Sequence, residues 1–163
     1  METVDVRGLF IIFISFILAL MLSILPLPPV LNAMQPQWVL LVLIYWVMAL
    51  PRQISVGIAF IMGLLVDTLN GQLLGQNALI MTFISYWIAK FHHYLDVQPL
   101  WQQAFSLFCL VSLYQLYTLC FELHLGFSSN LFWSHILSIF TSVLLWFWIA
   151  SLLSGFRVKS RLH

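Results

Sequence analysis

The stretch Trp38–Leu50 reads WVLLVLIYWVMAL and contains no charged side chain. Similar apolar runs recur outward from it over most of the chain, in which 63% of the 163 residues are hydrophobic and 7% are charged. A soluble globular domain usually carries about 25% charged residues, so these runs are not suited to face water. They are continuous rather than alternating with period two, and lipid requires backbone groups to be hydrogen-bonded internally. The sequence therefore predicts an all-α integral membrane protein.

Turn-forming residues divide the apolar sequence into six predicted transmembrane spans. Pro51 ends the second span, because proline does not continue a helix, and Asn70-Gly71 makes a tight turn after the third. Pro36 is expected in the first turn of the second span, where its missing N–H leaves nothing unpaired. The predicted fold is a six-helix transmembrane bundle forming one domain over residues 1–163. Its spans are residues 9–25, 36–50, 54–69, 73–89, 104–121 and 131–153.

The positions of Lys and Arg predict the orientation, because short loops rich in these residues stay in the cytoplasm. All of them fall on one side of the predicted bundle: Arg7, Arg52, Lys90, Arg157, Lys159 and Arg161. The loops on the other side contain none, so both termini are expected in the cytoplasm. Five tryptophans fall near predicted span ends, where indole rings favour the headgroup region: Trp38, Trp46, Trp87, Trp101 and Trp133.

Asp67 is the only carboxylate inside a predicted span, and an ionisable group within a membrane is a candidate functional residue because it is costly there. It lies within one turn of the outer end of the third span, just before Asn70-Gly71. We therefore expect a structural role, with the carboxylate reaching interfacial water or capping the fourth span. The alternatives are a contact with a partner helix and, less favoured, an ion or a substrate.

A narrow face of small side chains recurs every four residues on the third span: Ser55, Ala59, Gly63 and Asp67. Such faces allow close approach of helices in lipid, where association depends on packing. We expect a contact within the bundle; a contact with another subunit, including a homo-oligomer, is the alternative. Gly71 and Gly75 continue the spacing into the turn, and Gly71 is expected to have a positive φ.

The fifth span is polar for a membrane helix, because it contains Tyr114, Gln115, Tyr117 and Thr118. Hydrogen bonds between helices are the expected use of these side chains, and the lining of a pocket is the alternative. The histidines do not suggest a metal site. His92-His93 is on the predicted cytoplasmic side, whereas His124 and His135 lie toward the other side, so no three are expected to converge.

No sequence motif of an enzyme is present. The chain has no Gly-x-Ser-x-Gly elbow, no phosphate-binding loop and no paired carboxylates at a useful spacing, so we expect neither catalysis nor a cofactor. A net charge of +1 also argues against a nucleic-acid partner, because phosphate binding requires clustered Lys and Arg.

Several short motifs, in order, resemble the MreD rod shape-determining family. Residues 35–41 read QPQWVLL, and Gly63 to Asp67, then Gly71, match the family's Gly-x-x-x-Asp-x-x-x-Gly stretch. The likeness covers essentially the whole chain and is most specific over residues 38–75. The resemblance to the family implies no catalytic residue in this chain. The candidates for structural roles or partner contacts are Asp67, Gly63, Gly71, Gly75, Ala59, Pro36, Trp38 and Pro51.

The resemblance implies a non-enzymatic, multi-pass subunit of the cell-elongation machinery in the bacterial inner (cytoplasmic) membrane. It implies a direct partner, the bitopic protein MreC, and through it the MreB filament, RodA and penicillin-binding synthases. The implied role is to support lateral peptidoglycan synthesis and rod shape. The implied fold is similar to that of the substrate-binding subunits of energy-coupling-factor vitamin transporters.

That fold makes a substrate-binding subunit of a small-molecule transporter the alternative function. Its ligand would occupy an outward-facing pocket near Asp67 and the polar face of the fifth span. A pocket for a polar ligand needs several well-placed polar partners. Because the sequence shows few polar groups that would converge, we expect the scaffold rather than the transporter.

Overall fold

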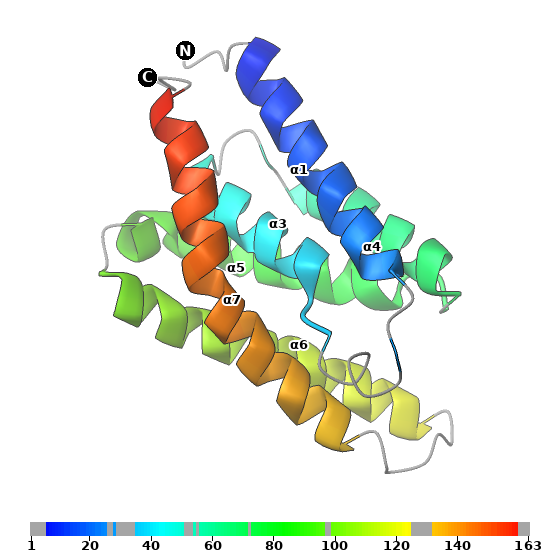
Figure 1. The fold of residues 1–163 in the computed structure, drawn as a ribbon. Coiled ribbons are helices and arrows are strands. Elements are labelled where there is room, and N and C mark those ends of the chain that lie inside the picture. Colours follow the sequence, from blue (N-terminus) through cyan, green and yellow to red (C-terminus); the bar gives the residue numbers. More distant parts are fainter. Residues whose placement is uncertain are drawn as a thin grey trace.

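The computed structural model describes residues 6–25, 28, 35–50, 54, 56–71, 73–96, 99–124 and 132–159. All regular secondary structure in these ranges is helical, which confirms the predicted all-α class with six helices. Pro51, Arg52, Ser55 and Arg161 lie outside the described residues. The helices are α1 (Val6–Ile24), α3 (Trp38–Ala49), α4 (Val56–Asn70), α5 (Gln76–Asp96), α6 (Leu100–His124) and α7 (Phe132–Lys159), and Figure 1 shows their arrangement.

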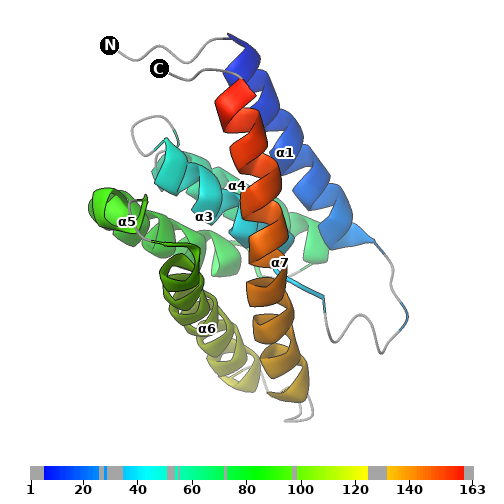
Figure 2. The same cartoon turned by 60° about the vertical axis from the view of Figure 1, so that its left-hand side comes forward.

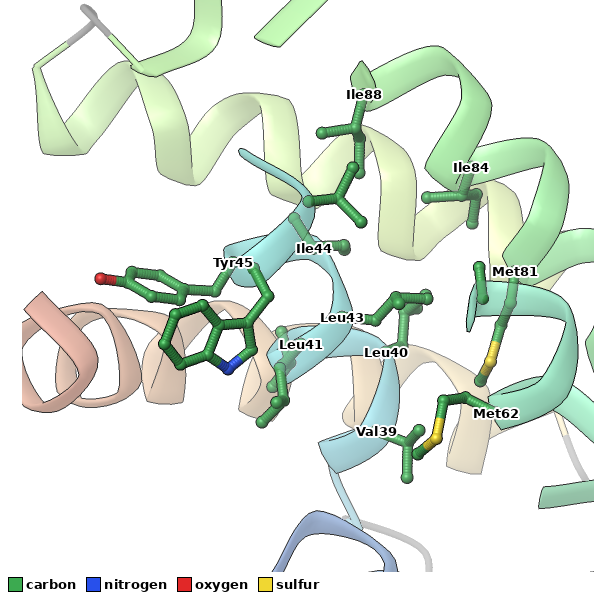
Figure 3. Close-up of a cluster of buried hydrophobic side chains, with 14 of the residues drawn as sticks. Val39, Leu40, Leu41, Leu43, Ile44, Tyr45, Met62, Met81, Ile84 and Ile88 are labelled. Carbon is green, nitrogen blue, oxygen red and sulfur yellow. The ribbon is translucent and has the colours of Figure 1, made fainter. Parts of the chain in front are cut away.

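Helix α3 is the centre of the fold. Every residue from Val39 to Met48 is buried, because α1, α5 and α7 pack around a helix that is apolar on all sides. Figure 3 shows side chains of α3 meeting Met62 of α4 and Met81, Ile84 and Ile88 of α5. Around this centre, α4 packs on α5 and α6 packs on α7, each pair being adjacent in the sequence.

Pro36 is not in the first turn of a helix, as the sequence had suggested. It lies two residues before α3, and its carbonyl oxygen accepts the N–H of Trp38 at 2.9 Å. Gln37 is the N-cap residue, and its carbonyl oxygen accepts the N–H of Leu41 at 2.9 Å in the first full helical hydrogen bond. Trp38 therefore begins α3 and packs, partly buried, against the core.

Trp46 is also placed differently from the prediction. It is only 1% exposed, and its indole Nε1 donates a hydrogen bond to Ser15 Oγ of α1 at 2.8 Å. Its ring meets that of Tyr45 edge to face. Trp46 is thus a core residue of α3, whereas Trp87, Trp101 and Trp133 are exposed.

The helices α5, α6 and α7 extend beyond the apolar runs from which their spans were predicted. Helix α5 continues to Asp96 through the polar sequence that follows Lys90. Its start is later than predicted, because Leu73, Leu74 and Gly75 belong to a turn in which the N–H of Gln76 donates to Leu73 O at 3.2 Å. Hydropathy locates the apolar part of a helix but not the hydrogen bonds that end it.

Consecutive helices run in alternating directions. One cavity is lined by the end of α1, residues before α3, the end of α4, the start of α5, the second half of α6 and the start of α7, so these segments share one end of the molecule. The start of α1 and the end of α7 lie together at the opposite end in both views (Figure 1, Figure 2).

The outside of the helices is strongly apolar. Large hydrophobic side chains are exposed along α1 and α7, including Phe10, Phe13, Met21, Leu144 and Trp148. By length and hydropathy, α6 within Trp101–His124 and α7 within Trp133–Leu152 are able to cross a membrane. Helices α1, α3 and α4 provide shorter apolar segments.

Candidate functional site

Asp67 is in the last turn of α4, and its side chain is 0% exposed. Its Oδ2 accepts the N–H of Gly75 at 2.8 Å, and its Oδ1 accepts the N–H of Asn77 at 2.9 Å. These donors stand at the start of α5, where helix N–H groups lack partners within the helix and the dipole favours a negative charge. The carboxylate therefore joins the end of α4 to the start of α5 and does not reach solvent.

The small residues of α4 allow its backbone to lie almost in contact with the backbone of α5. A Cβ atom built on Gly63 would lie 2.3 Å from Cα and 2.6 Å from N of Ala78, closer than any real contact. Ala59, one turn earlier, is fully buried. The close approach that Gly63 allows brings the N–H groups of α5 within reach of Asp67.

Gly71 and Gly75 do not continue this packing face, although their spacing had suggested it. Their φ angles are +63° and +101°, and no atom lies within 4 Å of a Cβ built on either one. Both residues instead have the left-handed backbone conformation that the turn between α4 and α5 requires.

A hydrogen-bond network of α5 and α6 begins next to Asp67. Tyr114 of α6 donates its hydroxyl to Asn77 Oδ1 at 2.5 Å, and Asn77 is itself bound through its N–H to Asp67. Thr118 Oγ1 donates to the carbonyl oxygen of Tyr114 at 3.0 Å. Of the polar residues predicted on the fifth span, Tyr114 and Gln115 connect helices, and Tyr114, Gln115 and Thr118 line a cavity.

A second network links α6, α7 and the residues before α3. Gln115 Nε2 donates to Ser138 Oγ at 2.8 Å, and Ser138 Oγ donates to the carbonyl oxygen of Gln35 at 2.8 Å. His135 of α7 lies between two side chains of α6, with Nδ1 2.7 Å from Gln115 Oε1 and Nε2 3.0 Å from Glu122 Oε2.

Both ring nitrogens of His135 are in hydrogen-bond contact with side chains of α6. Since Gln115 uses Nε2 to donate to Ser138, its Oε1 meets His135 as an acceptor, and Glu122 Oε2 is an acceptor as well. Both ring nitrogens of His135 are therefore engaged by α6, and Nε2 lies against the Glu122 carboxyl group.

These networks surround a cavity of about 630 Å³. Of its sixteen lining residues in the described part of the chain, only Ile24, Leu25, Pro36 and Leu69 are apolar, and none is a lysine or an arginine. The other twelve carry carboxamide, hydroxyl, imidazole or carboxylate groups. The expected scarcity of convergent polar groups was therefore wrong.

Sequence reasoning missed Glu122, His135 and Ser138. The predicted fifth span ended at residue 121, so Glu122 was assigned to a loop, although α6 continues to His124. A signal was present, because polar residues at i, i+3 and i+7 form one stripe on a helix. This spacing occurs twice, in Gln115, Thr118 and Glu122 of α6 and in His135, Ser138 and Ser142 of α7.

Among the described residues, no three His, Cys, Asp or Glu side chains are grouped as metal ligands would be. In the cavity, Glu122 and His135 are paired, but no third possible metal ligand among the described residues joins them.

The model of the family described as "rod shape-determining protein MreD" matches residues 5–156. The chain belongs to the MreD family. A curated member from Haemophilus influenzae, named "Rod shape-determining protein MreD", is 35% identical over 165 residues and covers 100% of both chains. No solved structure matches significantly, so the implied likeness to transporter subunits remains a prediction.

Within this MreD family chain, the residues that carried the family resemblance build the junction of α4 and α5. Gly63 permits the close approach, Asp67 binds the N–H groups of α5, and Gly71 and Gly75 form the turn. Leu69, Asn70 and Asn77 of this junction also line the cavity.

Proposed function

We propose that the chain is a non-enzymatic subunit of the bacterial cell-elongation machinery that spans the inner membrane six times. The observation that carries this proposal is the match of the MreD family over nearly the whole chain, together with the full-length relative named as a rod shape-determining protein. The apolar exterior supports the membrane location, because exposed Phe, Leu and Trp side chains are stable against lipid and not against water.

The direct partner in this proposal is a bitopic membrane protein of the MreC type. Through it the subunit would act on an MreB-like filament, RodA and penicillin-binding synthases, and so organise lateral peptidoglycan synthesis. The support within the molecule is its surface: α1 and α7 present long apolar faces on which another membrane helix can pack.

Rescue of cell shape tests this function. A rod-shaped bacterium depleted of its own MreD family protein becomes the host, and the chain is expressed from an inducible promoter. We expect rods to be restored, whereas cells that stay round despite normal membrane levels of the chain would contradict the proposal. A matched strain expressing the Haemophilus influenzae relative controls for compatibility between species.

The second candidate function is a substrate-binding subunit of a small-molecule transporter. The polar cavity favours this alternative, since its volume and converging polar groups are those of a ligand site. Co-purification separates the two functions, because the transporter would recover ATPase subunits and a coupling membrane subunit instead of a bitopic partner.

A further inference from the structure

We propose that the cavity lined by α6, α7 and the adjoining ends of α1, α4 and α5 binds a small, hydroxyl-rich molecule that is neutral or carries an amino group, the chemistry of a sugar or an amino sugar. This goes beyond the role in cell elongation and requires no transport. The segments that line the cavity meet at the end of the bundle opposite the start of α1 and the end of α7, as their ribbons in Figure 1 show.

The size and construction of the cavity are those of a preformed site. Its volume of about 630 Å³ lies within the roughly 300–1,000 Å³ typical of small-molecule sites. Its walls are held by hydrogen bonds that cross between elements, such as Gln115 to Ser138 and Ser138 to Gln35. Side chains fixed in this way are oriented before a ligand arrives, which lowers the entropy that binding costs.

The lining offers short-range hydrogen-bond partners rather than apolar surface. Carboxamides at Gln35, Gln37 and Asn70 and hydroxyls at Ser23 and Thr118 contribute to it. A molecule that pairs with such groups must carry many hydroxyls or amides of its own, since unpaired polar atoms lose their hydration on entry.

The charges of the cavity select against anions. No described lining residue is a lysine or an arginine, and both ring nitrogens of His135 are engaged by Gln115 and Glu122. A phosphate or carboxylate would find no free cationic donor and would face the Glu122 carboxylate. Among the described hydrogen bonds, Glu122 uses only Oε2, so Oε1 is placed to accept an ammonium group of the ligand.

Three probes that share one ring test this selection: glucosamine, glucose and glucose 6-phosphate. The full chain is placed in lipid nanodiscs, because sugar-headed detergents would compete, and each probe is titrated by calorimetry. We expect saturable binding of glucosamine, binding of glucose about tenfold weaker because one charge-assisted hydrogen bond is lost, and no binding of glucose 6-phosphate.

Two tryptophan variants locate the binding, and a third variant tests the contribution of the Glu122 charge. Leu69 lines the cavity from the end of α4, and Leu65 is exposed one turn earlier on the same helix but does not line it. Leu69→Trp fills space in the cavity and should weaken glucosamine binding at least tenfold, whereas Leu65→Trp should leave it unchanged. Glu122→Gln keeps the shape of the side chain and should make glucosamine and glucose bind equally.

Failure of both glucosamine and glucose to bind saturably would overturn the proposal. Equal or tighter binding of glucose 6-phosphate would also overturn it, and so would equal effects of the two tryptophan variants. If Leu69→Trp does not fold, as judged by gel filtration, the Glu122→Gln result decides alone. The role in cell elongation is measured separately by rescue of rod shape, so failure here does not count against it.

Discussion

Asp67 holds two helices together through the hydrogen bonds of one buried carboxylate. Replacing it with alanine leaves the N–H groups of Gly75 and Asn77 without their acceptor in a buried place. We expect Asp67→Ala to lower the free energy of unfolding by about 1–3 kcal/mol. Asp67→Asn should lose less, since its amide oxygen still accepts one bond. Unfolding in detergent, followed by far-UV circular dichroism, measures both.

Thr68→Ala is the matched control for Asp67, because Thr68 is adjacent, exposed, and bonded only to Leu65 O of its own helix in the described structure. It should unfold nearly as the parent chain does. An Asp67→Ala protein as stable as Thr68→Ala would mean that the carboxylate does not cap α5.

Gly63 permits a contact that no other residue allows. A methyl group there would meet backbone atoms of Ala78, which cannot rotate away as a side chain would. Gly63→Ala should therefore separate α4 from α5 and destabilise the fold by about 1–3 kcal/mol. Gly57→Ala, at an exposed position of the same helix, should be neutral or stabilising. The opposite order in thermal unfolding would refute the close approach.

At the scale of elements, α6 and α7 are joined by facing polar stripes. Ser138 accepts from Gln115 and donates to Gln35, so Ser138→Ala removes one partner from each. The expected loss is about 1–3 kcal/mol of unfolding free energy. Ser106→Ala is the control, because Ser106 bonds only Gln102 of its own turn in the described structure, and it should have little effect.

The apolar runs were enough to locate the six helices, since burial in lipid or core requires such runs. Helix ends were not predictable to the same degree. The fixed φ of proline suits the first turn of a helix, yet the hydrogen bonds of Gln37 and Trp38 place the start of α3 after Pro36. Glu122 was likewise placed in a loop, because the predicted span ended before it, although α6 continues to His124. Hydropathy falls at a polar residue, whereas a helix continues through it when a neighbour such as His135 supplies a partner.

Pairing between helices was harder still to predict from sequence. Asp67 was recognised as a capping candidate because Asn70-Gly71 follows it closely. The meeting of Gln115 and His135 depends on how α6 and α7 rotate against each other, which one sequence does not specify. Trp46 was expected at the membrane surface because it lies close to Pro51, which ends the predicted span. Its actual partner, Ser15, is on another helix, and the sequence alone does not show that contact.

For the molecule as a whole, the alternating helices place Asn70 and Lys90 at opposite ends. In a chain whose exposed Cys109 and Cys120 are replaced by serine, single cysteines at Asn70 and Lys90 report the orientation. A membrane-impermeant maleimide added to intact spheroplasts should label the Asn70→Cys protein. The Lys90→Cys protein should react only after permeabilisation. The reverse pattern would invert the proposed topology.

The most direct test of the account is to identify what the chain assembles with. The C-terminus is tagged, native membranes are solubilised in mild detergent, and every co-purifying protein is identified with its stoichiometry. We expect a bitopic MreC-like protein in fixed ratio, accompanied by elongation synthases. Recovery of ATPase and coupling subunits in its place would contradict it and assign the chain to transport.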